Sequence, residues 1–214
     1  MRYAVLGTGP AGQAISARLA GLGHDVAMGT RDATSPKALA LAAEHPDVRV
    51  ATFEDAATGA EVVVNATGGA VSLDVLHAAG NLDDKVIVDI SNPIDPASGF
   101  PPSLTVANTD SMGEQIQAAF PRARVVKSLN TINCDVMVDP AIVPGEHLVF
   151  VAGEHQDAKA TVAAMLQQFG WPPDRIVDLG GIDAARATEM YLALWIRLNL
   201  AGGGHLFNIA VNRG

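Results

Sequence analysis

The sequence predicts an α/β fold in which helices cover both faces of a mainly parallel sheet. Short apolar runs alternate with helical segments along most of the 214 residues, which is the pattern of a doubly wound sheet. Several runs are rich in β-branched residues without polar alternation, as is typical of strands buried on both faces. With 49% hydrophobic and 17% charged residues, the chain can bury a sizeable core.

The elements of the first half follow one another at regular spacing. Helices are expected after the first two strands and between the next two, at residues 10–22, 36–44 and 71–80. Ser35 is the expected N-cap of the second of these helices, and proline follows it. The expected strands are 2–7, 25–29, 61–67 and 85–91.

The second half repeats this alternation after a proline-rich loop. A helix should begin after Ser111, since Glu114 completes a capping-box pattern. Strands are expected at 123–130, 147–153 and 175–181, with a helix at 156–169 and a long apolar helix from about residue 183. We therefore expect a dinucleotide-binding domain at 1–140 and a smaller, tightly packed α/β part at 141–214.

Charge and cysteine content exclude several classes of protein. A net charge of −9 argues against nucleic acid or an anionic membrane as a partner. One cysteine, Cys134, allows neither an intramolecular disulfide nor a CxxC motif. No basic leader precedes the first strand, so we expect a cytoplasmic protein. The apolar stretch 190–211 is interrupted by Arg197, Asn199 and His205, which favours a buried helix over a membrane span.

A glycine-rich motif directly follows the first expected strand and opens the first helix. It reads Gly7, Thr8, Gly9, Pro10, Ala11, Gly12 and matches GxGxxG. In a Rossmann unit these glycines permit a tight turn, close approach of a pyrophosphate and close packing of helix on strand. The alternative is a glycine turn that has lost its ligand.

The end of the second strand indicates which nucleotide is bound. NAD-preferring proteins usually carry an acid there, which bonds the ribose hydroxyls, whereas this chain has Gly29 followed by Thr30 and Arg31. A forked guanidinium suits a 2′-phosphate, and Lys37 offers a further charge. Against this, Asp32 could turn toward the ribose. We predict NADP.

Loops after the later strands should line the nicotinamide side, because ligands of open α/β sheets lie beyond the carboxyl ends of the strands. The candidates are Ala66, Thr67 and Gly68, then Ser91, Asn92 and Pro93, then Asn130 and Thr131. The alternative is that these candidates are ordinary polar loop residues.

No residue is marked by the sequence as a metal ligand, nucleophile or general acid. The six histidines show no HxxxH spacing, Cys134 is expected to be a small buried thiol, Lys127 lies at a strand end, and Lys159 is expected on an exposed helix. Transfer of hydride between two redox cofactors needs mainly orientation and exclusion of water. The absence of an acid fits such a transfer, and equally a non-catalytic NADP sensor.

Four segments together resemble the NADP oxidoreductases that depend on coenzyme F420. They are "MRYAVLGTGPAGQAISARLAGLGHDVAMGTRD", "DISNP", "ARVVKSLNT" and "DLGGIDAARATEMYLALWIRL". Relatives of that family include the cytosolic reductase domain of the STEAP metalloreductases, which uses flavin.

The resemblance implies a deazaflavin held over the nicotinamide between the Rossmann domain and the C-terminal part. It places Thr8, Gly9, Thr30, Arg31 and Lys37 at NADP, and Arg186 on the wall of the deazaflavin pocket with Asn130, Thr131 and Met190. Archaeal members carry histidine at the position of Asn130 and hydroxyl residues at Met190 and Leu192. These departures fall on the deazaflavin side and put the second redox partner in doubt.

The last helix is compatible with a core or a pocket. Ala185, Thr188, Leu192 and Trp195 share one face, while Arg186 could instead pair with Glu189 on a solvated face. Trp195 and Phe207 are expected in the core, and the apolar C-terminus is expected to pack in a homodimer.

The sequence thus predicts an oxidoreductase that transfers hydride between NADP(H) and F420 or a flavin-like small molecule. Two alternatives stay open: an NADPH-dependent reductase of a small carbonyl, imine or ferric substrate, and a regulatory NADP sensor.

Overall fold

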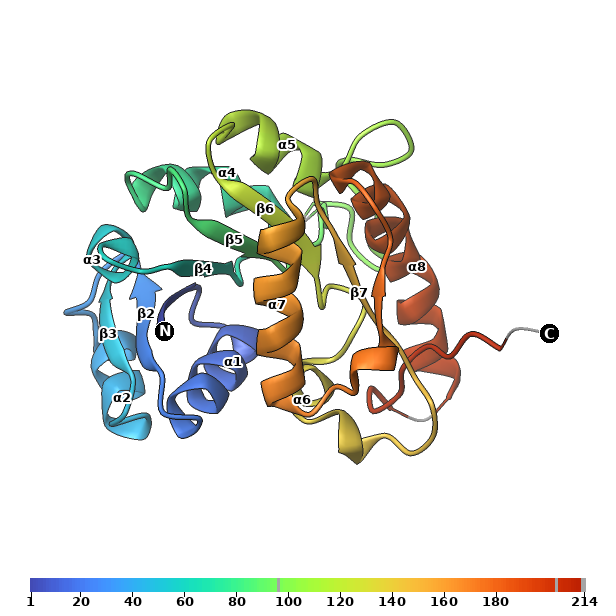
Figure 1. The fold of residues 1–214 in the computed structure, drawn as a ribbon, viewed down its shortest axis with the longest axis horizontal. Helices are drawn as coiled ribbons and strands as arrows, with labels where there is room; N and C mark the ends of the chain where they lie inside the picture. Colours follow the sequence, from blue (N-terminus) through green and yellow to red (C-terminus); the bar gives the residue numbers. More distant parts are fainter. Residues whose placement is uncertain (96, 203, 213–214) are drawn as a thin grey trace.

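The computed structural model describes residues 1–95, 97–202 and 204–212. One eight-stranded sheet runs through the molecule in the order β3-β2-β1-β4-β5-β6-β7-β8 (Figure 1). All neighbouring strands are parallel except β6 and β7. The strands are β1 (Arg2–Leu6), β2 (Asp25–Thr30), β3 (Arg49–Thr52), β4 (Val62–Asn65), β5 (Val86–Asp89), β6 (Arg124–Ser128), β7 (Val149–Ala152) and β8 (Ile176–Asp178).

Helices cover both faces of this sheet, so the predicted doubly wound fold is confirmed. Ser35 caps α2 as predicted, accepting a hydrogen bond from the backbone N–H of Ala38. The helices are α1 (Pro10–Gly21), α2 (Pro36–Glu44), α3 (Phe53–Ala57), α4 (Gly69–Ala78), α5 (Met112–Ala119), α6 (Cys134–Val138), α7 (Gln156–Phe169) and α8 (Ala185–Ala201).

The core forms two layers, one on each face of the sheet. In β1, Tyr3 and Val5 pack in the layer with α1 and α7, whereas Ala4 and Leu6 pack in the layer with α4 and α5. This alternation follows from the two-residue period of a strand. Because β1 and β4 lie side by side at the centre, the strand order reverses there, and the loops after both strands meet at the switch point of the sheet.

The C-terminal part extends the same sheet. β7 pairs with β6 in antiparallel orientation, and α7 connects β7 to the parallel β8. The predicted division near residue 140 stays a prediction. The elements that sequence analysis did not anticipate are short: β3, α3 and α6.

Among the described residues, no helix combines the length and apolarity needed to cross a membrane.

Candidate functional site

The glycine-rich loop is shaped by close backbone contacts at the switch point. Gly7 has φ of +122°, and a Cβ on it would lie 2.5 Å from the carbonyl oxygen of Ala66. A Cβ on Gly12 would lie 2.1 Å from the carbonyl oxygen of Gly7. Both positions therefore require glycine, one for its conformation and both for space.

Two other glycines in the same region have free space around the position of a Cβ. A Cβ on Gly9 or on Gly68 would meet nothing within 4 Å. Gly9 is the N-cap of α1 and Gly68 that of α4, and neither N-terminus is capped by a side chain. The uncapped N–H groups of two helices thus border an accessible surface, which suits a pyrophosphate.

The end of β2 resolves the question raised by Asp32. Its carboxylate accepts hydrogen bonds from the backbone N–H and hydroxyl of Thr34, at 2.8 and 2.7 Å. The hydroxyl bond of Thr34, followed by its backbone bond, lowers the pKa of Asp32. Asp32 is therefore used within its own loop.

Arg31 is exposed and lines a hollow of about 350 Å³ with Thr52, Phe53, Val71 and Val75. Lys37 is exposed in the first turn of α2. Within the described part of the chain, neither Arg31 nor Lys37 has an ion-pair partner. Packing restricts position 29 to glycine, since a Cβ there would lie 2.7 Å from Leu6 Cδ2. Glu54 and Asp74 line the hollow as well. The end of β2 thus offers the positive charge of Arg31, while the carboxylate of Asp32 is held within its own loop.

Hydrogen bonds tie the three later strand-end loops together. The backbone N–H of Gly69 donates to the carbonyl of Asn92. The Asn92 amide donates to the carbonyl of Asn130 at 2.8 Å, and the Asn130 amide donates to Asn92 Oδ1 at 3.0 Å. Thr67, by contrast, turns its hydroxyl inward to Asn65 Oδ1 at 2.6 Å, and Ser91 is buried. The structure therefore brings the predicted loops together, with Asn92 half-buried and Asn130 buried where the loops meet.

A second hollow of about 310 Å³ lies beside these loops and α8. Among the residues that the structure describes, none with a charged side chain lines it. The lining residues are Pro10, Ala11, Ile90, Asn92, Asn130, Thr131, Ile132, Asn133, Cys134, Met137, Leu192 and Trp195. We call it the α8 hollow. Leu192 and Trp195 lie in it as the predicted helix face requires, and Trp195 stacks on Phe207 with ring centroids 5.4 Å apart.

Arg186 and Met190 do not line the α8 hollow. Arg186 donates from Nε to Glu114 Oε2 at 2.8 Å and from Nη2 to Glu114 Oε1 at 2.5 Å. The alternative pairing of Arg186 with Glu189 is wrong, because Arg186 pairs with Glu114 and the buried carboxylate of Glu189 pairs with Lys127. The predicted contact of Arg186 and Met190 with a second substrate stays a prediction.

A buried polar network that was not predicted from the sequence lies beneath these loops. Lys127 Nζ lies 2.7 Å from Asp89 Oδ2, 2.7 Å from Glu189 Oε1 and 2.6 Å from the carbonyl oxygen of Ser91. Asp89 Oδ1 in turn accepts from the amide of Asn65 at 2.8 Å. Lys127 occurs in a continuous apolar strand, which was the available signal of a buried charge.

Two further expectations need correction or refinement. Lys159 is not exposed: it is 4% exposed because Nζ reaches across to Asp178 Oδ1 and the carbonyl of Gly180. Cys134 is half-buried at the α8 hollow, and burial, with Asp135 nearby, raises the pKa of its thiol. A raised pKa keeps the thiol protonated, so Cys134 is no activated nucleophile. No cluster of metal-ligating residues occurs in the described ranges.

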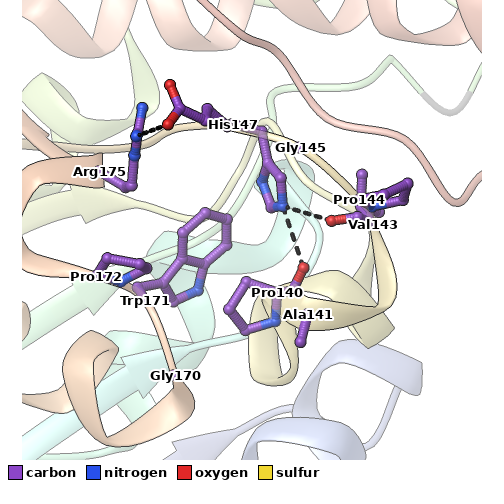
Figure 2. Close-up of a pocket in the computed structure, with 11 residues that line it drawn as sticks. Pro140, Ala141, Val143, Pro144, Gly145, His147, Gly170, Trp171, Pro172 and Arg175 are labelled. Atoms are coloured by element: carbon purple, nitrogen blue, oxygen red, sulfur yellow. Dashed lines mark hydrogen bonds and ion pairs between the residues drawn. The ribbon is translucent and has the colours of Figure 1, made fainter.

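A third hollow, of about 420 Å³, lies between residues 140–147 and 170–175 and is lined by His147, Trp171 and Arg175, among others (Figure 2). His147 Nε2 faces the carbonyls of Pro140 and Val143, and the Trp171 indole N–H donates to the carbonyl of Met137. Arg175 pairs with Glu146 at 2.7 Å. These polar groups already have protein partners, so the hollow offers no free recognition group.

Comparison with known proteins places the chain. Residues 2–93 match the model of the family described as NADP oxidoreductase coenzyme F420-dependent. The F420-dependent NADP reductase of Methanothermobacter marburgensis is 30% identical over 94% of this chain and 93% of its own length. A solved structure from Arthrobacter sp. FB24, provisionally named an F420-dependent NADP reductase, is 50% identical over all of both chains, with a TM-score of 0.94.

The metalloreductase STEAP3 of Rattus norvegicus is 28% identical over 88% of this chain. The chain spans only about a third of the length of that relative (36%), so the comparison concerns only the matching third of STEAP3. The likeness to the full-length reductase and the solved structure is decisive: this chain is an oxidoreductase that belongs to the family of coenzyme F420-dependent NADP oxidoreductases.

Proposed function

We propose that this protein binds NADP(H) at the switch point and exchanges hydride with a deazaflavin of the F420 type in the α8 hollow. The observation that carries the choice of NADP is the end of β2. Arg31 lines the hollow there without an ion-pair partner in the described chain, while Asp32 is turned back onto Thr34. The family supports the choice of F420.

The residues present fit both groups. The two uncapped helix N-termini at Gly9 and Gly68 suit the pyrophosphate, and Arg31 with Thr30 and Lys37 suits the 2′-phosphate. Phe53, Val71 and Val75 provide an apolar surface for the adenine. The uncharged lining of the α8 hollow suits the flat ring system of a deazaflavin, since small-molecule sites are mostly apolar with a few polar groups.

When bound, the pair supplies hydride transfer from C5 of the reduced deazaflavin to C4 of NADP⁺, which yields oxidised deazaflavin, NADPH and one proton released to water. The chain contributes orientation and exclusion of water, which need no general acid at the reacting carbons. Asn92 and Asn130 contribute polar groups to the lining of the hollow.

The function is tested by mixing the protein with reduced F420 and NADP⁺, with NAD⁺ in a parallel reaction, and following the return of deazaflavin absorbance. We expect turnover with NADP⁺ and little with NAD⁺. NADPH binding without turnover would refute hydride transfer to F420 and direct the assay to flavins and small carbonyl, imine or ferric substrates.

The choice of nucleotide is tested by Arg31→Ala. A charge-assisted hydrogen bond is worth about 1.5–3 kcal/mol, so NADPH affinity should fall tenfold or more while NADH affinity is unchanged. Arg49→Ala is the matched control, because Arg49 is also exposed at this edge of the sheet but donates to the carbonyl of Asp55. Equal losses for both nucleotides, or an equal loss in Arg49→Ala, would contradict the assignment.

We also propose that α8 mediates a homodimer. Met190, Leu194 and Leu198 are spaced four residues apart and are 38%, 54% and 42% exposed. Sedimentation should therefore show a dimer that Leu194→Glu dissociates; a monomeric wild type would refute it.

A further inference from the structure

A single buried ammonium group connects the two walls of the α8 hollow. The side chain of Lys127 is 0% exposed. Its three hydrogens match three acceptors: Asp89 Oδ2, Glu189 Oε1 and the carbonyl oxygen of Ser91, at 2.6–2.7 Å. Every hydrogen-bonding site of this ammonium is therefore used within the protein.

The acceptors belong to opposite walls. Ser91 lies between Ile90 and Asn92, and both of these residues line the hollow on the sheet side. Glu189 lies on α8, one turn before Leu192, which lines the hollow on the helix side. The Lys127 ammonium thus links α8 directly to the loop after β5.

The far ends of this network are anchored as well. Glu189 accepts hydrogen bonds from the backbone N–H groups of Met112 and Gly113, at 2.9 and 3.1 Å, at the N-terminus of α5. Asp89 Oδ1 accepts from the backbone N–H of Ser91 at 3.1 Å and from Asn65. Both carboxylates therefore have a fixed position, and the ammonium transmits that position from one wall to the other.

Stability alone is a poor explanation for this arrangement. Burying two carboxylates and an ammonium costs desolvation free energy, and well-packed apolar residues in place of a buried ion pair are often equally stable. What an apolar cluster lacks is direction, because only a hydrogen-bonded network fixes separations to within a few tenths of an ångström.

We propose that Lys127 is a positioning residue that, through Ser91 and Glu189, sets the width of the α8 hollow and so the fit of the two redox rings within it. The part that concerns the rings rests on the proposed function. The part that concerns the width of the hollow does not.

The chain offers a matched control in Lys159. It is also a buried lysine, 4% exposed, and its Nζ bonds Asp178 Oδ1 at 2.8 Å and the carbonyl of Gly180 at 3.2 Å. None of these three residues lines the α8 hollow. Lys127→Met and Lys159→Met therefore remove the same buried ammonium group from two ion pairs. The Asp178 carboxylate is 45% exposed, and only the Lys127 network connects the walls.

The kinetic test compares these variants with Glu189→Gln, a nearly isosteric change that keeps the variant testable if Lys127→Met does not fold. For the reaction of F420 with NADPH, we expect kcat to fall about 10- to 100-fold in Lys127→Met, because a misplacement of about 1 Å can cost 10²-fold. In Glu189→Gln the fall should be about three- to tenfold. The Kd of NADP⁺ should change less than about threefold, since the pyrophosphate loop is intact. Lys159→Met should keep the kcat of the wild type despite its lost ion pair.

The second readout needs no redox partner. In a Trp171→Phe background, Trp195 on the wall of the hollow is the single source of tryptophan emission, because the chain has two tryptophans. Acrylamide should quench the emission of Trp195 at least twofold more efficiently in Lys127→Met and Glu189→Gln than in the parent protein with Trp171→Phe alone. Quenching in Lys159→Met should equal that of the parent.

The outcomes separate the two proposals. Wild type without F420 turnover refutes the proposed function, and the quenching comparison still decides the role of Lys127. Unchanged kcat and quenching in Glu189→Gln, or equal changes in Lys127→Met and Lys159→Met, would overturn the positioning role.

Discussion

The nucleotide end and the second-substrate end of the candidate site differ in the groups that shape them. The nucleotide end is made of backbone: glycines without room for a Cβ, and helix N-termini without capping side chains, all within the first seventy residues. The second-substrate end is lined by residues from the start of α1, the loops after β5 and β6, α6 and α8, so its parts come from the whole length of the chain. A backbone requirement restricts a position to glycine, whereas a side-chain requirement can be met by several residue types.

The largest expected effect separates glycines that shape the loop from a glycine that admits the ligand. Gly12→Ala would place a methyl group 2.1 Å from the carbonyl oxygen of Gly7. We expect it to lower Tm by about 10 °C, since a clash with backbone costs several kcal/mol, and to abolish NADP binding. Differential scanning fluorimetry with and without NADP⁺ measures both effects.

Gly9→Ala is the contrasting variant, because its Cβ would meet no atom and its φ is −79°. Its Tm should stay within about 2 °C of wild type, since glycine and alanine at an N-cap differ modestly. NADP⁺ affinity should nevertheless fall at least tenfold if the pyrophosphate approaches this backbone. Retained affinity would show that Gly9 does not border the nucleotide.

The contrast between the two ends explains what the sequence could predict. The strands, the GxGxxG turn and the Ser35 cap follow from local patterns, because each depends on residues within one or two turns. The Lys127 network does not, since its partners Asp89 and Glu189 are 38 and 62 positions away. The apolar run around Lys127 indicates a buried charge, but it does not indicate which carboxylates pair with it.

Lys159 shows the same limit from the other direction. The helical pattern of α7 predicts which residues face the sheet, but a lysine stem can lie along apolar surface and carry its ammonium to a distant carboxylate. Whether Asp178 lies within reach depends on the packing of α7 on β8, which is a tertiary fact. The pairing of Arg186 with Glu114 instead of Glu189 has the same cause.

An intermediate effect is expected at the Asn92–Asn130 pair, which joins the two ends. Asn130→Leu leaves Asn92 Oδ1 without its donor, and an unsatisfied buried group costs about 1–3 kcal/mol, or about 2–10 °C in Tm. We expect the KM for F420 to rise several-fold while the Kd of NADP⁺ stays constant, as measured by steady-state kinetics and fluorescence titration. Asn81→Leu on the exposed surface is the control; a rise in the NADP⁺ Kd alone would place Asn130 at the nucleotide end.

The smallest effect concerns two carboxylates with basic partners, Glu114 with Arg186 and Glu189 with Lys127. Hydrogen bonding by Arg186, with a further bond from Ser111, holds the pKa of Glu114 below its ordinary value of 4.5. Burial raises the pKa of Glu189 above the same value, against the opposing effect of Lys127. The two carboxylates therefore contribute to stability with opposite dependence on pH.

The sign follows from linkage. A depressed pKa gives Glu114 a stabilising contribution that is present above pH 4.5 and is lost as the pH falls through its folded value. Arg186→Met should hence lower Tm by a few degrees at pH 7 and by much less near pH 3. Glu189 contributes in the reverse sense, so the Tm of Glu189→Gln relative to wild type should increase as the pH rises above 4.5. Scanning fluorimetry of the three proteins from pH 3 to 8 measures both trends. Parallel slopes in the two variants would contradict the opposite pH dependence of the two carboxylates.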